Sequence, residues 1–314
     1  MVFPELLPSF LYSPPPSIFI SAMSIISFLS LTHSGFMESK GKNMQYAKFF
    51  NNAGSIKTSS VDKKAKLSGR IGMVIFYTPP LLVGMASFAF LPNDGGLRFD
   101  LLRLALIIHF FKRVFEVLFI HKFSGEMEIE AAIIISLSYF VSTASIIYAQ
   151  HLTNGLPEPS IDLMYVGILL FLLGITGNFY HHYLLSKLRS KGDEQYKIPQ
   201  GGLFNLVICP HYLFEIIGFI GVSCIAQTLY ALSFTIGTLF LLMGRSIATR
   251  RWYLSKFDNF PKNTRLKEAK KVFDTMSSRG CKPDAHSYDI LINPDLLTCS
   301  VLFDIWVDFL AMDI

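Results

Sequence analysis

Long apolar runs constrain the fold of this 314-residue chain more than any other feature. A helix needs about 20 predominantly apolar residues to cross a bilayer, and the sequence holds roughly seven such runs. Their approximate ranges are 17–36, 70–91, 100–120, 131–150, 161–182, 204–226 and 229–247. With 51% hydrophobic residues, 16% charged residues and a mean hydropathy of +0.43, the chain is too apolar for a soluble domain of its length. The sequence predicts an all-α, polytopic membrane protein with about seven transmembrane helices.

The first run is expected to be an uncleaved anchor. Prolines crowd the residues before it, and no basic segment of the kind that opens a signal peptide precedes it. These prolines are Pro4, Pro8, Pro14, Pro15 and Pro16.

Basic residues alternate between the connections, as expected when Lys and Arg accumulate on the cytoplasmic side. The basic connections and the tail contain Lys40, Lys42, Lys48, Lys57, Lys63, Lys64, Lys66, Lys122, Lys187, Arg189, Lys191, Lys197, Arg250, Arg251, Lys256 and Lys262. The intervening connections hold only Arg98 in 92–99 and no basic residue in 150–161. The pattern predicts a lumenal N-terminus and cytosolic basic loops. The net charge of +5 is then mostly a topology signal and no argument for nucleic-acid binding.

Ionisable residues inside the apolar runs indicate a polar cavity or internal pairs, because charge is costly at membrane depth. His109, Lys112, Arg113 and Glu116 recur at helical spacing, so they face either a cavity or the bundle as a helix end with a Lys112–Glu116 pair. His211 and Glu215 lie one turn apart and are expected to address one cavity, the alternative being a protonated Glu215 bonded to a neighbouring helix.

Two further sets of residues have plainer interpretations. Arg245, Arg250 and Arg251 suit either lipid headgroups or a phosphate ligand. The four cysteines show no CxxC or metal spacing, so no metal site is expected.

The polar and basic stretch from Gly177 to Gly202, between two apolar runs, predicts a cytosolic site for an anionic ligand. It gathers more hydrogen-bond donors than a simple connection needs. These are Asn178, His181, His182, Lys187, Arg189, Lys191 and Lys197.

Several of these residues carry a resemblance to a known family. Asn178 with LLSKLR, Tyr196, KIPQGGLF, Glu215 and the terminal RRWYLSKFDNFPK resemble the C-terminal domain of the steroid 5α-reductase family, which includes very-long-chain enoyl-CoA reductases. The resemblance implies a seven-helix membrane fold of the endoplasmic reticulum and NADPH-dependent reduction of a carbon–carbon double bond conjugated to a carbonyl. No glycine-rich Rossmann fingerprint is present.

The resemblance also implies which residues contact NADPH from the cytosolic side. Carried over by position, these are Asn178, Arg189, Tyr196, Lys197, His211, Glu215 and Tyr253. Arg and Lys suit phosphate oxygens, while Asn178 and Glu215 can bond amide or ribose groups.

Two positions depart from the steroid reductases, in which a glutamate and a tyrosine grip the substrate's keto oxygen. Tyr77 stands at the glutamate position and Phe110 at the tyrosine position. Tyr77 is therefore predicted to supply the catalytic hydroxyl, with an ordinary interfacial tyrosine as the alternative, and Glu116 is the second predicted catalytic residue.

The substrate class stays open between a long-chain 2-enoyl-CoA and a 3-oxo-4-ene steroid or another isoprenoid. HFFKRVFEVLFIHKFS and CPHYLFE resemble the enoyl-CoA branch, whereas IPQGG resembles the steroid branch. The expected partners are a lipid substrate and membrane lipids.

The residues after Lys262 have a different character. TRLKEAKKVFDTMSSRGCKPDAHSYDILIN resembles one incomplete pentatricopeptide repeat, and a single repeat cannot bury its apolar face. No nucleic-acid partner is expected from it. The predicted organisation is an anchor and basic loop (1–69), a reductase-like membrane domain (70–263), the partial repeat (264–293) and an unassigned tail (294–314).

Two other functions compete with the reductase. An inactive family member acting as a membrane interaction protein would explain Phe110, Tyr77 and the change of character after Lys262. A transporter is disfavoured because the chain shows no internal repeat.

Overall fold

The structure is a computed structural model that describes residues 9–13, 17–42, 65–92, 95–123, 125–188 and 196–260. Within these ranges the chain is almost entirely helical. The helices are α2 (Ile18–Ser39), α3 (Gly69–Phe90), α4 (Gly96–Phe115), α5 (Ile129–His151), α6 (Met164–Lys187), α7 (Pro210–Ala226) and α8 (Leu229–Lys256). A π-helical turn, η2 (Glu116–Ile120), extends α4, and a 3₁₀ turn, η3 (Gly202–Asn205), precedes α7.

Each predicted apolar run coincides with one of these helices. Five of the described helices, α2, α3, α5, α6 and α8, are long and apolar enough to cross a membrane. Helix α4 contains five charged residues and α7 has only 17 residues, so these two do not meet the same criterion. The predicted class, an all-α polytopic membrane protein, is confirmed.

Local signals explain where several helices begin and end. The hydroxyls of Ser17, Ser68 and Thr228 accept hydrogen bonds from backbone N–H groups in the first turns of α2, α3 and α8. Pro210 opens α7, where its missing N–H costs nothing. Gln227 ends α7 in the left-handed region, with φ +49°.

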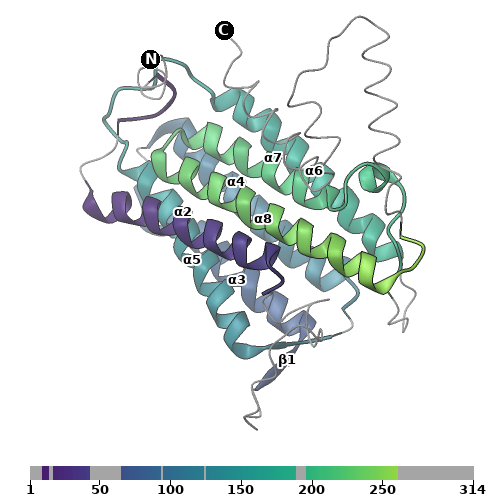
Figure 1. Cartoon of the computed structure of the whole chain (residues 1–314). Helices are drawn as coiled ribbons and strands as arrows, with labels where there is room; N and C mark the ends of the chain where they lie inside the picture. Colours follow the sequence, from purple (N-terminus) through teal and green to yellow (C-terminus); the bar gives the residue numbers. More distant parts are fainter. Residues whose placement is uncertain are drawn as a thin grey trace, which may run out of the picture.

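Two helix pairs approach closely because glycines meet at their crossings. Helix α6 lies along α7, and α2 lies along α8 (Figure 1). A Cβ on Gly174 of α6 would collide with the backbone of Gly218 in α7, and one on Gly244 of α8 would collide with that of Gly35 in α2. Small residues at such crossings let helix backbones pack directly in a membrane.

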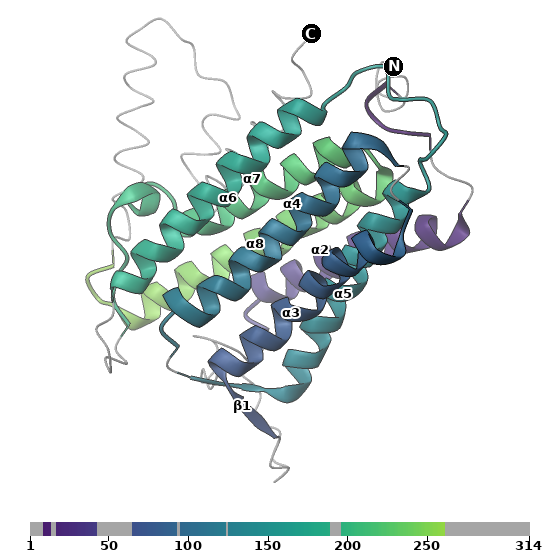
Figure 2. The same cartoon turned by 180° about the vertical axis from the view of Figure 1, so that it is seen from behind.

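Helix α4 runs through the middle of the bundle, between the α6–α7 pair and the α3–α5 pair (Figure 2). The largest buried cluster surrounds it and includes Phe99, Leu102 and Leu106 of α4 with Phe219 and Tyr230 of the neighbouring helices. A second cluster, around Phe76, Tyr77 and Phe110, joins α3 to α4.

A short two-stranded sheet was not predicted from the sequence. Strands β1 (Lys66–Ser68) and β2 (Glu126–Glu128) pair antiparallel, with Leu67 opposite Met127. Each strand leads directly into a helix, so the sheet fixes where α3 and α5 begin.

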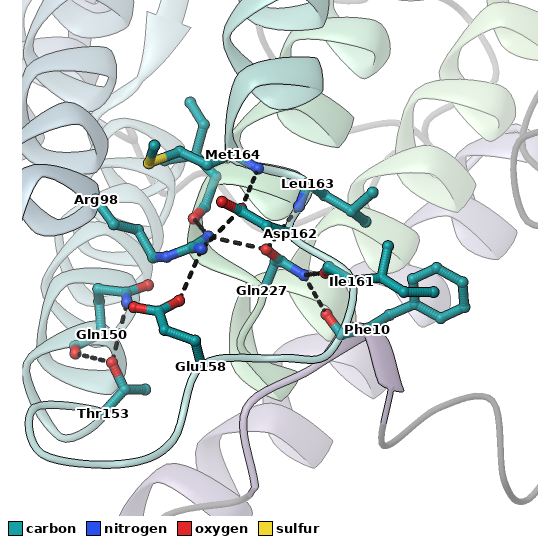
Figure 3. Close-up of polar contacts among 11 residues, drawn as sticks. Phe10, Arg98, Gln150, Thr153, Glu158, Ile161, Asp162, Leu163, Met164 and Gln227 are labelled. Atoms are coloured by element: carbon teal, nitrogen blue, oxygen red, sulfur yellow. Dashed lines mark hydrogen bonds and ion pairs between the residues drawn. The ribbon is translucent and has the colours of Figure 1, made fainter. Parts of the chain in front are cut away.

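One end of the bundle, called the distal end here, is closed by a polar network around Arg98 and Gln227 (Figure 3). Arg98 donates to Glu158 and Asp162, both at 2.8 Å, and to the Gln227 side chain at 2.9 Å. The Gln227 amide donates to the carbonyls of Phe10 and Ile161 and accepts from the N–H of Leu163. Arg98, the single basic residue of its connection, is thus neutralised within the protein.

Candidate active site

A cavity of about 970 Å³ lies inside the bundle. Its walls come from α2, α3, α4, α5, α6, α7 and α8, from residues between 121 and 127, and from the segment 196–209 that precedes α7. Along α8 it reaches from Phe234 to Tyr253, about 28 Å at 1.5 Å of rise per residue. A cavity of this size and length can hold more than one small ligand.

The lining changes from apolar to polar along the cavity. One part, the apolar arm, is lined by side chains of α2, α5, α7 and α8. They include Met23, Ile26, Leu31, Ile134, Leu137, Val141, Phe219, Phe234 and Leu241. The other part, the polar chamber, is lined by Tyr77, Arg113, His121, His182, Tyr196, Lys197, His211, Glu215 and Tyr253. This one continuous cavity can therefore contact a lipid tail along the apolar arm and a charged ligand in the polar chamber.

Tyr77 lies in the chamber wall, and its hydroxyl contacts a guanidinium. Arg113 Nη2 donates to the Tyr77 hydroxyl oxygen at 2.5 Å, and the guanidinium also stands 4.6 Å from the Tyr77 ring. The rings of Phe76 and Tyr139 pack against Tyr77. Because the hydroxyl oxygen accepts from Arg113, its own proton is available to a group inside the chamber.

Glu116 lies behind this wall and is fully buried. Its carboxylate contacts Lys112 Nζ at 3.1 Å, Arg113 Nη1 at 2.9 Å and His182 Nδ1 at 3.1 Å. Both interpretations of the charged face of α4 therefore hold in part. The Lys112–Glu116 pair faces the bundle, whereas Arg113 lines the cavity.

Glu116, His121 and His182 also offer three metal-ligand atoms within 4.8 Å of one another. The Glu116 carboxylate is, however, already neutralised by Lys112 and Arg113, whose two positive charges repel an added cation. The group therefore supports an internal ion-pair network better than a metal centre.

His121 follows the π turn at the edge of the chamber. Burial first, and then the Arg113 charge, lower the pKa of His121 to about 4. The imidazole is consequently neutral at physiological pH and adds no positive charge beside Arg113.

Three of the predicted cofactor residues meet where α6 crosses α7. The Asn178 amide donates to the carbonyl of His211 at 2.7 Å and to Glu215 at 3.4 Å. Its carbonyl oxygen accepts from Lys112. His211 and Glu215 line the chamber, while Asn178 is not among the lining residues and bonds the backbone of His211 and the carboxylate of Glu215.

The other predicted cofactor residues come from segment 196–209 and the end of α8. Tyr196, Lys197 and Tyr253 all line the chamber. The Tyr196 ring packs edge-on against Trp252 at 4.7 Å, so α8 holds the start of the segment. Arg189 lies outside the described residues.

Three chamber residues, Arg113, His121 and His182, had no catalytic or cofactor role predicted from the sequence. Arg113 was expected to face a cavity or the bundle, and His182 was one of the donors in the stretch from Gly177 to Gly202. Arg245 pairs with Glu38 of α2 at 2.6 Å. This internal ion pair is neither the lipid headgroup contact nor the phosphate contact expected from the sequence. The signal for Arg113 was present, since it lies three residues before Glu116 on one helical face.

Phe110, which stands where the steroid reductases have a tyrosine, is buried behind Tyr77. Its ring contacts His109 and Tyr139 in the apolar cluster that joins α3 to α4. Tyr77 is thus a hydroxyl of this wall that bonds Arg113, and the neighbouring Tyr139 also lines the cavity.

Comparisons with known proteins identify two regions of the chain. Residues 128–266 match the family model described as 3-oxo-5-alpha-steroid 4-dehydrogenase. Residues 257–294 match the PPR repeat family, in line with the resemblance of the tail, most of which lies outside the described residues.

Curated relatives come from both branches that the sequence motifs resemble. The chain is 33% identical over 167 residues to a very-long-chain enoyl-CoA reductase of Dictyostelium discoideum, covering 51% of this chain and 53% of that protein. It is 42% identical over 98 residues to a steroid 5-alpha-reductase of Gossypium hirsutum, covering 31% and 38%. It is 40% identical over 98 residues to 3-oxo-5-alpha-steroid 4-dehydrogenase 2 of Homo sapiens, covering 31% and 39%. The chain thus spans about half of the first relative's length and less of the other two.

Proposed function

Because residues 128–266 carry the 3-oxo-5-alpha-steroid 4-dehydrogenase domain, we propose that the chain reduces a carbon–carbon double bond conjugated to a carbonyl in a lipid substrate, using NADPH. The observation that carries this proposal is the Tyr77 hydroxyl. It accepts from Arg113 and faces a cavity with one polar and one apolar part. A reductase of lipid enones needs both parts and a hydrogen-bond donor where they meet.

The polar chamber suits a nicotinamide cofactor. Lys197 provides a cation for phosphate oxygens, and Tyr196 and Tyr253 offer aromatic surfaces and hydroxyls. His211 and Glu215, which both contact Asn178, can bond ribose or amide groups. A bound nicotinamide supplies the hydride in this class of reaction.

Tyr77 is assigned the role of stabilising the charge that develops on the substrate. When hydride adds to the β-carbon, the electron pair of the double bond moves onto the carbonyl oxygen. The Tyr77 O–H donates a hydrogen bond to that oxygen, and the adjacent Arg113 charge makes this donation stronger. The α-carbon then takes a proton, which completes the addition of two hydrogens.

Glu116 acts indirectly in this scheme. It is fully buried and contacts Arg113 and Lys112, so it fixes the guanidinium that holds Tyr77. Glu116 is thus a positioning residue, which holds Arg113 in the wall of the chamber.

The apolar arm fits the hydrocarbon part of either substrate class, a long-chain 2-enoyl-CoA or a 3-oxo-4-ene steroid. The proposed setting is the endoplasmic reticulum, with the chamber end on the cytosolic side and the distal end in the lumen. Lys42, Lys122 and Lys197 line the cavity at the proposed cytosolic end.

The test uses the full chain purified in detergent. NADPH binding is measured by the cofactor's fluorescence, and NADPH oxidation is then followed with a long-chain 2-enoyl-CoA and with a 3-oxo-4-ene steroid. Oxidation that depends on one of them is the expected result and identifies the substrate class. Absence of NADPH binding would overturn the proposal, while binding without turnover of either substrate would favour an inactive membrane interaction protein.

A further inference from the structure

Segment 196–209 lines the polar chamber and packs against the bundle along its length, and its η3 turn makes a polar contact to α6. Five of its residues, Tyr196, Lys197, Phe204, Ile208 and Cys209, line the cavity. At its start, Tyr196 and Ile198 pack against the cluster around Trp252 and Tyr253 of α8. Its middle, the η3 turn, contacts a residue of α6 that does not line the cavity.

That residue is His181, which is 3% exposed. Its Nε2 accepts a hydrogen bond from the backbone N–H of Leu203 at 3.2 Å, and its Nδ1 contacts the carbonyl oxygen of Gly177 at 2.7 Å. A carbonyl only accepts and an N–H only donates, so Nδ1 carries the proton and Nε2 does not. The imidazole is neutral, in one tautomer, and makes both bonds at once.

The Leu203 N–H needs this partner. Leu203 is the second residue of η3, and N–H groups in the first turn of a helix have no acceptor within that helix. The bond therefore gives η3 a cap that comes from a different element. Ring contacts hold the imidazole in place, since Phe214 stacks on it at 5.2 Å and Phe204 meets it edge-on at 5.6 Å.

The backbone next to this hydrogen bond also leaves room for the His181 ring. Gly202 has φ +52°, and a Cβ at that position would lie 2.9 Å from His181 Nε2. The glycine therefore allows η3 to reach the imidazole at the distance the bond requires.

We infer that His181 is a positioning residue that holds segment 196–209 over the chamber and thereby sets the affinity for the cofactor. This inference rests on the proposed function, because the cofactor is assigned to the chamber there. The neighbouring His182 has a different place, since it lines the chamber and contacts Glu116. The adjacent histidines of α6 thus have different places: His181 bonds segment 196–209, and His182 belongs to the chamber wall.

The test replaces His181 by Phe, which keeps an aromatic ring between Phe204 and Phe214 but loses both hydrogen bonds. His181→Phe should speed amide hydrogen exchange in the peptide that contains Leu203, and should raise the Kd for NADPH about tenfold or more, the scale of one buried N–H left without a partner. The kcat at saturating NADPH should change less than about threefold, because hydride transfer uses groups that His181 does not touch. His151→Phe, the same change near the distal end, should alter neither quantity.

Gly202→Ala provides a second, independent disturbance of the same contact. It should raise the Kd for NADPH as His181→Phe does. The Kd of the double variant should be no higher than that of the worse single variant, because both changes break the same contact. Unchanged exchange at Leu203 in His181→Phe would overturn the anchoring role. Faster exchange with an unchanged Kd would overturn the link to the cofactor.

Failure of the proposed function looks different. Wild-type protein that binds no NADPH would end both the proposed function and the cofactor part of this inference. The exchange experiment would still decide whether His181 anchors the segment, because it needs no ligand.

Discussion

At the scale of single residues, the chamber depends on contacts between side chains from different helices. Tyr77 belongs to α3 and Arg113 to α4, and they are 36 residues apart in the sequence. The sequence could predict Tyr77 from its position in a resembling motif. It could not predict Arg113 as its partner, because that contact depends on how α3 packs against α4.

Removing the Tyr77 hydroxyl tests its catalytic role. Tyr77→Phe should lower kcat about 100-fold or more, the usual scale for losing one well-placed proton donor, with a much smaller change in KM for NADPH. Tyr230→Phe is the matched control, since the Tyr230 side chain does not line the cavity and its buried hydroxyl bonds Ser27. Unchanged turnover in Tyr77→Phe would exclude the hydroxyl from the reaction.

The lowered pKa of His121 predicts a loss of stability in mild acid. The unfolded histidine binds a proton near pH 6.5 but the folded one only near pH 4, so protons favour the unfolded chain as the pH falls between these values. At pH 5.5 the cost should be about 1.4 kcal/mol. Thermal unfolding in detergent at pH 7.5 and 5.5 measures it, and His121→Gln should reduce the difference. An equal difference in the variant would show that other groups cause the acid sensitivity.

At the scale of helices and turns, the sequence predicted the described helices well because apolar runs are local signals. The π turn η2 and the two-stranded β1–β2 sheet were not predicted. Residues 126–128, for example, are too few to predict a strand, and they form one because residues 66–68 lie beside them. Such elements depend on contacts between distant parts of the chain.

The α6–α7 crossing makes an asymmetric prediction about two facing glycines. A Cβ on Gly174 would collide with the backbone of Gly218 and with the Phe214 carbonyl, whereas a Cβ on Gly218 would meet only Gly174, at an ordinary 3.8 Å. Gly174→Ala should destabilise the protein by about 1–3 kcal/mol, the usual cost of overpacking. Gly218→Ala should be neutral or stabilising, because alanine favours the helix. Thermal unfolding of both variants checks this, and equal losses would contradict the crossing geometry.

At the scale of the whole molecule, the polar network that closes the bundle and the polar chamber lie toward different ends. The distal end is closed by the network of Arg98 and Gln227, and the polar chamber of the cavity lies toward the other end. The charge pattern of the loops predicted two different ends. It did not predict that Arg98 is paired internally, because Glu158 and Asp162 approach it only in the folded chain.

This separation predicts that the distal network stabilises the fold without affecting ligand binding. Gln227→Leu removes bonds to Arg98, Leu163, Phe10 and Ile161 and should lower the free energy of unfolding by about 2–4 kcal/mol, since it leaves buried polar groups unpaired. The Kd for NADPH should stay within about twofold of the wild-type value. A large change in Kd would mean that the two ends are coupled.

The apolar arm has a consequence for the turnover rate. A reduced lipid differs from its precursor by two hydrogens near the carbonyl, so the arm contacts the tails of both equally. Such uniform binding improves capture of scarce lipid but holds the product as tightly as the substrate. Under the proposed function, longer substrate tails should therefore make product release the rate-limiting step, so the apolar arm would set an upper limit on turnover.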